Sequence, residues 1–470
     1  MQDITKIADL QDGQECSISG KVIRTFERRG VFVSTILDDS GMLDVSTPDQ
    51  LLLDSILTAS GRVTKRKASI EMRVKDIAQV KDTGDISKRI DAFIESKSIP
   101  LESPPLIQDA IMNSIHPSIL ECAKRILLAH FLLRPIVLRY HCDADGICAA
   151  LSIARPIRKG AGRFISFQNG GATYQLQDTL RDINMLRSFG ESTGIPLFIL
   201  VDMGSGPENT DSLDILRGAG VETVLIDHHP LSPDVSEMVD CIVSPATVSA
   251  SSSYTAGLLS GEVSKSMGAE NISILQKISL AGDKSDLMTH ERESIRKALV
   301  LDYLGKYSKF PNTLEFYSGI LSDEPMLNSL YMQASSKLEN ALRVAKESLK
   351  VKELSNGFRL CITNLQKAVR PRAFPGKGLI CGVLHDYMAS EMSGPLVTIG
   401  YSGKLISLRA NTEARERGFD ANAIISDIKR ELINSIESGG GHDIAASVHV
   451  NEGFENIVLE EIIRHIYSLP

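Results

Sequence analysis

Histidine and aspartate side chains that can bind metal ions gather at four places along this sequence. The four clusters are His141, Asp143 and Asp145; Asp202; Asp227, His228 and His229; and Asp283. The first three directly follow apolar segments at 136–140, 196–201 and 223–226, and the fourth follows an apolar segment at 272–281. In an open parallel sheet, ligands bind beyond the carboxyl ends of the strands, so we expect the first three clusters to converge.

The donor atoms of these clusters predict the kind of ion. Carboxylate oxygens with few imidazoles and no thiolate favour Mn²⁺ or Mg²⁺ over a structural zinc ion. So many carboxylates repel one another unless cations neutralise them. Two divalent ions about 3.5–4 Å apart would do so and would clamp a phosphodiester. We therefore predict two divalent cations, with Mn²⁺ preferred and Mg²⁺ as the alternative, and six ligands: His141, Asp143, Asp145, Asp202, His228 and Asp283.

Each cluster taken alone has a simpler explanation. An aspartate after a strand, such as Asp202, is usually a helix N-cap. The segment 227–230 is compatible with a turn, and the segment 141–146 with a calcium site or with chance. All of them in order after successive strands favour the metal-site interpretation.

A glycine-rich segment near the C-terminus indicates contact with a phosphate. Gly439, Gly440 and Gly441 let backbone amides approach a phosphate closely, and His442 can donate a hydrogen bond to it. Arg409 is suited to a bidentate phosphate contact, although a surface ion pair explains this arginine equally well. We interpret the segment as a substrate-binding lid.

Strands and helices alternate from residue 135 onward, which predicts an α/β fold with a parallel sheet. The expected strands are 136–140, 164–167, 196–201 and 223–226, and the expected helices are 146–159, 179–189, 210–217, 249–267 and 272–281. Residues 286 to about 352 are expected to be mostly helical. A smaller α/β unit follows, with strands at 360–362, 396–401 and 404–409 and an amphipathic helix at 422–436.

The N-terminal residues are expected to form a small β-barrel. Short alternating strands, a turn at 38–41 and a helical stretch near 49–57 match the strand plan of an OB barrel, whose open face binds oligonucleotides. The residues expected on this nucleic-acid-binding arm are Arg24, Phe26, Arg28, Arg29, Phe32, Lys65 and Arg66. The alternative is that Phe32 packs in the core and the charges are solvated.

These elements predict five regions. They are an OB-like nucleic-acid-binding domain at 1–82, a linker with helices at 83–134, a catalytic α/β domain at 135–305, a helical connector at 306–355 and a substrate-binding α/β domain at 356–470. Within the second region, residues 83 to about 112 are expected to be a connector, followed by a helix that has Pro117 near its first turn.

Composition fits a cytoplasmic globular protein. Hydrophobic residues make up 43% and charged residues 23% of the 470 residues, and the polar start does not predict a signal peptide. The seven cysteines lie far apart without a CxxC pair, which favours reduced thiols. A net charge of −8 does not favour a nucleic-acid binder, although bound cations would cancel part of it and a local basic groove can coexist with it.

The ordered clusters resemble the four motifs of the DHH phosphoesterases. The segment 141–146 (His-Cys-Asp-Ala-Asp-Gly), Asp202, the triplet 227–229 and Asp283 carry this resemblance, and the segment 439–442 resembles the glycine-rich histidine motif of the C-terminal domain that accompanies them. The likeness spans residues 135 to about 450, and the OB-like front end makes the chain similar to an archaeal RecJ-like nuclease.

The resemblance implies a DHH catalytic domain, a DHH-associated domain, and an exonuclease that acts on single-stranded nucleic acid in DNA repair or replication through a two-metal-activated water. One Mn²⁺ would be held by His141, Asp143 and Asp202, and the other by Asp145, Asp202, His228 and Asp283. His229 would face the substrate or support the metal site, and Asp227 would orient the histidines. The implied catalytic residues are Asp143, Asp145, Asp202, His228 and His229, and the implied phosphate-binding residues are Arg409 and Gly439 to His442.

The chain departs from the family pattern in two ways. Bacterial RecJ carries its OB domain after the catalytic core, whereas this chain starts with one. Asp443 and Ser447 follow the glycine motif, and an acid beside a phosphate site is unusual. Because no metal position is missing, we expect an active enzyme.

Three functions remain open. The first is an exonuclease on single-stranded DNA or RNA. The second is a phosphodiesterase of short oligonucleotides or cyclic dinucleotides, which suits the acidic net charge. The third is a replisome subunit bound to GINS-like proteins, for which 286–352 would offer a partner surface. No membrane association is expected.

Overall fold

The computed structural model describes residues 4–66, 69–80, 84–157, 162–189, 191–306, 312–370 and 373–470. The chain forms two compact units. The first contains Met1–His141 and Cys148–Gln276, and the second contains Cys142–Ile147 and Lys277–Pro470. The chain thus leaves the first unit directly after His141.

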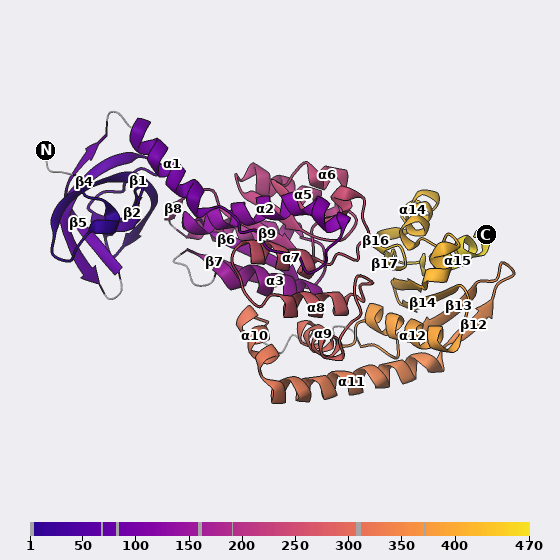
Figure 1. The fold of residues 1–470 in the computed structure, drawn as a ribbon. Coiled ribbons are helices and arrows are strands. Elements are labelled where there is room, and N and C mark those ends of the chain that lie inside the picture. The colour runs from indigo at the N-terminus through magenta and orange to yellow at the C-terminus, as the bar shows by residue number, and fades with distance from the viewer. Residues whose placement is uncertain are drawn as a thin grey trace. The chain divides into compact units, whose positions relative to one another are not determined.

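Five strands of the first unit form a closed N-terminal barrel (Figure 1). They are β1 (Glu15–Arg28), β2 (Val31–Leu37), β3 (Met42–Thr47), β4 (Ile56–Arg66) and β5 (Ser69–Gln79). Their order is β2-β3-β5-β4-β1, and pairing of β2 with β1 closes the barrel. Pairs are antiparallel except β3 with β5, which are parallel. Alternating apolar side chains such as Ile18, Ile36 and Val45 fill the interior, which confirms the predicted OB-like barrel.

The prediction of a helical stretch near 49–57 is wrong. The segment between β3 and β4 is irregular, and Ile56 already belongs to β4. Asp54 has a left-handed backbone with φ 63°. The amide of Asp54 donates to the carbonyl of Val22, and the amide of Val22 donates to the carbonyl of Ser55. Pairing with β1 therefore overrides the local helical tendency of the leucines.

Two helices follow the barrel. Helix α1 (Gly84–Lys97) occupies part of the expected connector, and Ile90 of α1 is buried together with Ile23 and Leu37 of the barrel. Helix α2 (Ala110–Phe131) is capped by Asp109, so it starts earlier than expected, and Pro117 lies inside it. A short strand that the sequence did not predict, β8 (Glu191–Thr193), pairs antiparallel with β1. These contacts hold the barrel within the first unit.

A parallel sheet forms the rest of the first unit. Its strands are β6 (Ile136–His141), β7 (Phe164–Asn169), β9 (Leu197–Val201), β10 (Glu222–Ile226) and β11 (Cys241–Val243), in the order β11-β10-β9-β6-β7. The helices of this part of the chain are α3 (Ala144–Ile157), α4 (Leu176–Ser188), α5 (Thr210–Gly218), α6 (Pro233–Ser236), α7 (Ala256–Ser266) and α8 (Ser273–Gly282), and the boundaries between the two units fall within α3 and α8. The predicted parallel α/β sheet is confirmed, although α7 begins later than the expected residue 249, because Thr255 caps it by accepting a hydrogen bond from the amide of Leu258.

The second unit combines helices with a mixed sheet (Figure 1). The helices are α9 (Arg292–Gly305), α10 (Leu314–Ser322) and α11 (Glu324–Glu347). The sheet contains β12 (Lys350–Glu353), β13 (Arg359–Asn364), β14 (Leu396–Ser402), β15 (Leu405–Ala410), β17 (Ala445–Val450) and β16 (Ile436–His442), in this order. It is accompanied by α12 (Lys377–Glu391), α13 (Thr412–Glu416), α14 (Ala421–Glu431) and α15 (Glu455–Ser468). The predicted C-terminal α/β domain is therefore present, although the helix expected at 422–436 ends at Glu431.

Among the described residues, no helix combines the length and the apolar character that a bilayer crossing requires.

Candidate metal centre

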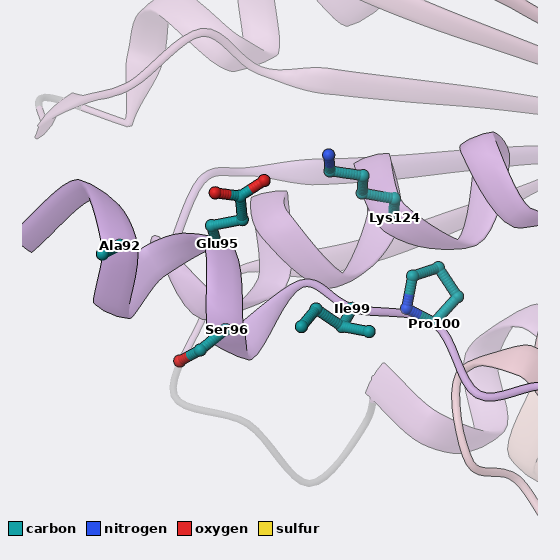
Figure 2. A pocket seen from close by; sticks show the side chains of 6 residues that line it. All are labelled: Ala92, Glu95, Ser96, Ile99, Pro100 and Lys124. Atoms are coloured by element: carbon teal, nitrogen blue, oxygen red, sulfur yellow. The ribbon is translucent and has the colours of Figure 1, made fainter.

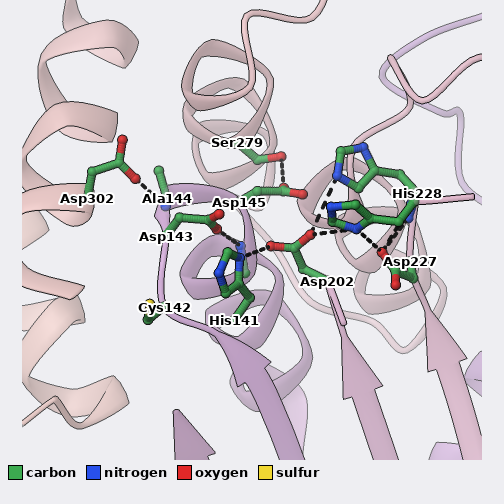
Figure 3. Close-up of polar contacts among 12 residues, drawn as sticks. His141, Cys142, Asp143, Ala144, Asp145, Asp202, Asp227, His228, Ser279 and Asp302 are labelled. Atoms are coloured by element: carbon green, nitrogen blue, oxygen red, sulfur yellow. Dashed lines mark hydrogen bonds and ion pairs between the residues drawn. The ribbon is translucent and has the colours of Figure 1, made fainter. Parts of the chain in front are cut away.

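Asp202 lies between histidines from two other strand ends of the first unit (Figure 3). It directly follows β9, and its amide donates to the carbonyl of Ile226 at the end of β10. Its Oδ2 lies 3.2 Å from Nδ1 of His141, which ends β6, and its Oδ1 lies 3.5 Å from Nε2 of His228. The two carboxylate oxygens thus face different histidines, which is the arrangement that a bridging metal ligand needs.

The environment of Asp202 fits a cation. The residue is 1% exposed, and within the described part of the chain its Oδ1 accepts no hydrogen bond. A buried carboxylate oxygen without a donor is costly, and a bound cation would compensate it. The backbone of Asp202 has a φ of 56°, a left-handed conformation that is rare outside glycine and that is often found at functional sites.

Asp227 orients the two histidines that follow it. Its Oδ1 accepts hydrogen bonds from the amides of His228 and His229, at 2.8 and 3.2 Å, and from Nδ1 of the His229 ring at 2.8 Å. Burial by itself would raise the pKa of Asp227, but the adjacent His229 ring outweighs burial and lowers it. Burial likewise would lower the pKa of His229, and the Asp227 carboxylate raises it instead. The two shifts favour the charged forms of both side chains, and the hydrogen bonds of Asp227 hold the His229 ring in one orientation.

Ser252 fixes the ring of His228, a contact that the sequence did not predict. The carbonyl oxygen of Ser252 lies 2.6 Å from Nδ1 of His228, so this nitrogen carries the proton and Nε2 is left as the metal-binding atom. Ligand atoms of Asp202, Asp227, His228 and His229 all lie within 4.8 Å of one another. In the sequence, only the serine-rich run at 249–253 could have indicated this contact, and we interpreted that run as the start of a helix.

The predicted aspartate ligands Asp143, Asp145 and Asp283 belong to the second unit. The carboxylate of Asp143 accepts a hydrogen bond from the amide of Gly146 at the start of α3. The carboxylate of Asp145 is 1% exposed and accepts a hydrogen bond of 2.5 Å from the hydroxyl of Ser279 on α8 (Figure 3). Asp283 follows α8 directly and donates its amide to the carbonyl of the same Ser279. Ser279 therefore forms hydrogen bonds with two of the predicted ligands, Asp145 and Asp283.

The last turn of α9 holds the loop that carries Asp143 and Asp145. Asp302 accepts a hydrogen bond of 2.8 Å from the amide of Ala144 (Figure 3). Lys306 lies 2.9 Å from the sulfur of the buried Cys142. The distance between these residues in sequence explains why the contacts could not be predicted.

The glycine segment lies in a strand rather than in a loop. Gly439 to His442 form part of β16, which pairs antiparallel with β17. Gly441 has a φ of 146°, and a Cβ there would lie 2.4 Å from the carbonyl oxygen of Ala445. The requirement for glycine at 441 therefore comes from the neighbouring strand, whereas a Cβ at Gly440 would meet no atom within 4 Å.

The surface ion pair that was the alternative explanation for Arg409 is not found among the described residues. Arg409 donates to the carbonyl oxygens of Leu408, Ala446 and Gly378, and within the described residues it has no carboxylate partner. Asp443 forms an ion pair of 2.9 Å with Arg415, which neutralises the unusual acid. Ser447 lies 2.9 Å from the hydroxyl of Ser407 across the strand pair.

The predicted arm residues of the barrel are only partly free for a ligand. Arg24 lies 3.6 Å from Asp44 and 4.9 Å from the centre of the Phe26 ring, and Arg28 lies 3.5 Å from Glu71. Arg29 is exposed in the β1–β2 turn, Lys65 is exposed in β4, and Phe26 and Phe32 are half-buried. The side chain of Arg66 lies outside the described residues.

A separate hollow lies between α1 and α2 (Figure 2). It is lined by Ala92, Glu95, Ser96, Ile99, Pro100 and Lys124. None of the predicted site residues lines it.

Comparisons with known proteins identify a family domain in the chain. Residues 135–279 match the DHH family, N-terminal domain. The whole chain aligns with 71% of an uncharacterized protein of Methanocaldococcus jannaschii at 25% identity. A solved structure described as the DHH domain of a member of a family of ribosomal proteins is 25% identical with a TM-score of 0.75, and the match covers 82% of this chain and 99% of that one.

The fold also resembles that of a RecJ protein from Thermus thermophilus, solved in complex with Mn²⁺. The identity is 14% and the TM-score is 0.52, over 81% of this chain and 59% of that one. The predicted resemblance to DHH and RecJ-like proteins is therefore confirmed.

Proposed function

Because residues 135–279 carry a DHH-family domain, we propose that this protein is a metal-dependent phosphodiesterase that degrades single-stranded nucleic acid from an end. The observation that carries the proposal is the position of Asp202, whose two carboxylate oxygens face His141 and His228. Its buried oxygen without a hydrogen-bond donor among the described residues fits a cation. The likeness in fold to a RecJ in complex with Mn²⁺ supports a divalent cation, and we take Mn²⁺ as the preferred ion.

We assign two ions to the predicted ligands. His141, Asp143 and Asp202 would hold the first, and Asp145, Asp202, His228 and Asp283 the second. Chain connectivity supports this assignment, since Asp143 follows His141 after one residue. Two bound divalent cations would polarise a phosphoryl oxygen and favour ionisation of the attacking water.

The protein's own residues set the geometry of the reaction. Asp227 and the carbonyl of Ser252 fix the ring orientations of His229 and His228, so the metal-binding nitrogen of His228 is pre-positioned. His229 is partly exposed and is assigned to the substrate side. Arg409 and the segment 439–442 are assigned to the substrate phosphate.

A second candidate is a phosphodiesterase of short oligonucleotides or cyclic dinucleotides. The barrel favours it, because Arg24 and Arg28 already have carboxylate partners and contribute less free positive charge to a long strand. The net charge of −8 points the same way.

End-labelled substrates test the proposal. The wild-type protein, Asp202→Ala and the control Asp214→Ala, an exposed aspartate on α5, are incubated with Mn²⁺ and long single strands of DNA or RNA labelled at either end. We expect stepwise shortening from one end, slowed more than about 100-fold in Asp202→Ala and unchanged in the control. Cleavage of di- to tetranucleotides without cleavage of long strands would replace the exonuclease with the second candidate.

A further inference from the structure

Two cationic side chains approach the same face of α12 in the second unit. Gly378 and Gly382 lie one turn apart on this helix and present no side chain. The guanidinium of Arg409 donates a hydrogen bond of 3.1 Å to the carbonyl of Gly378. A Cβ at Gly382 would lie 3.5 Å from Nε of Arg409 and 3.9 Å from Nζ of Lys284. The absence of side chains at both glycines thus lets Arg409 and Lys284 both lie close to this stretch of α12.

The charge of this group is not balanced. The hydrogen-bond acceptors of Arg409 are the carbonyl oxygens of Leu408, Ala446 and Gly378, and no carboxylate pairs with it in the described chain. Lys284 forms an ion pair with Asp386, and both side chains are more than half exposed. The neighbouring His385 adds no charge at neutral pH, because burial lowers its pKa to about 4. Arg409, Lys284 and Asp386 together therefore carry one net positive charge, and the side chains of Lys284 and Asp386 are open to solvent.

The chain places Lys284 next to a proposed metal ligand. Lys284 directly follows Asp283, and consecutive Cα atoms are about 3.8 Å apart. This adjacency to a proposed metal ligand is the reason to expect an anion bound by Lys284 near the reacting phosphodiester. A phosphate suits the two donors, because a guanidinium and an ammonium can each donate to a different phosphate oxygen at about 2.8 Å.

We propose that Lys284 and Arg409 together bind a non-scissile phosphate of the substrate. Lys284 then determines specificity, since it favours substrates with a second phosphate beside the one that is cleaved. The preferred substrate class is an oligonucleotide or a terminally phosphorylated dinucleotide, and a dinucleotide with a single phosphodiester is disfavoured. This inference rests on the proposed phosphodiesterase function.

Two substitutions with opposite effects test the assignment. Lys284→Gln and Asp386→Asn both remove the same ion pair, but the first removes a cation and the second frees one. Each variant and the wild type are assayed with Mn²⁺ on one dinucleotide in three forms: without a terminal phosphate, with a 5′-phosphate and with a 3′-phosphate. The measured quantity is the ratio of kcat/KM for the better phosphorylated form to that for the unphosphorylated form.

We expect the wild-type protein to prefer one phosphorylated form by about tenfold or more. Lys284→Gln should lower this ratio about tenfold, and Asp386→Asn should raise it or leave it high. Lys404→Gln is the matched control, because it removes an exposed ion pair with Glu452 elsewhere in the second unit and should leave the ratio unchanged. Thermal unfolding of each variant checks that the fold is kept.

The outcomes separate the two proposals. No cleavage of any dinucleotide or longer strand by the wild-type protein would overturn the phosphodiesterase function itself. Cleavage of the three dinucleotides at equal rates, or a fall of the ratio in both Lys284→Gln and Asp386→Asn, would overturn the phosphate site and leave the phosphodiesterase function standing.

Discussion

Gly305 on α9 lies so close to the carbonyl oxygen of Cys142 that a Cβ at this glycine would be 1.8 Å from it. The same turn of α9 supplies Asp302, which accepts a hydrogen bond from the amide of Ala144. The loop with the predicted ligands Asp143 and Asp145 thus packs against a helix that lies more than 150 residues later in the chain.

Gly305→Ala is expected to destabilise the protein by about 3 kcal/mol or more, because backbone must move to accept the methyl group. Urea unfolding measures the loss. Gly319→Ala on α10 is the control, because a Cβ there meets no atom within 4 Å, and it should raise stability by about 0.5–1 kcal/mol. Equal stability of the two variants would contradict the close contact.

Ser279→Ala is expected to weaken Mn²⁺ affinity about tenfold, since its hydroxyl orients the carboxylate of Asp145. Titration followed by the electron paramagnetic resonance of free Mn²⁺ measures this affinity. Ser260→Ala is the matched control, because Ser260 is also a buried helical serine and its hydroxyl has no hydrogen-bond partner in the described chain. The same affinity in both variants would exclude a positioning role for Ser279.

The Asp227–His229 pair should make the stability of the metal-free protein depend on pH. The pKa of His229 is raised, so its contribution is complete below the ordinary histidine pKa of about 6.5 and is lost as pH rises through the raised value. The pKa of Asp227 is lowered, so its carboxylate stays charged throughout this range. His229→Gln should therefore destabilise more at about pH 6 than at about pH 9. Urea unfolding in EDTA measures the difference, and an equal effect at both pH values would refute the ion pair.

Phe26→Ala is expected to weaken binding of a long single strand by about tenfold, through the loss of base stacking. Fluorescence anisotropy of a labelled strand with Asp202→Ala as background measures binding without cleavage. Tyr467→Ala, an exposed aromatic of the C-terminal helix, serves as the control. If Phe26→Ala binds the long strand as well as the control does, the barrel is not the nucleic-acid arm.

The sequence predicted the parts of the molecule whose pattern is local. Asp202 and the triplet 227–229 were identified because each directly follows an apolar strand, and strand ends meet at one sheet edge. Ser252, Ser279, Asp302 and Lys306 were missed because they reach the site from distant elements and carry no motif of their own. The prediction of a helix near 49–57 was wrong because a contact distant in sequence, the pairing with Val22 on β1, decides the conformation of that segment.

The number of Mn²⁺ ions bound per chain tests the central claim most directly. Isothermal titration of the wild-type protein, Asp202→Ala and Asp214→Ala measures this number without any assumption about the substrate. The proposed centre predicts two ions for the wild type and the control, and a loss of both high-affinity sites in Asp202→Ala, because this carboxylate is assigned to both ions. Two ions bound with undiminished affinity by Asp202→Ala would contradict the proposed centre.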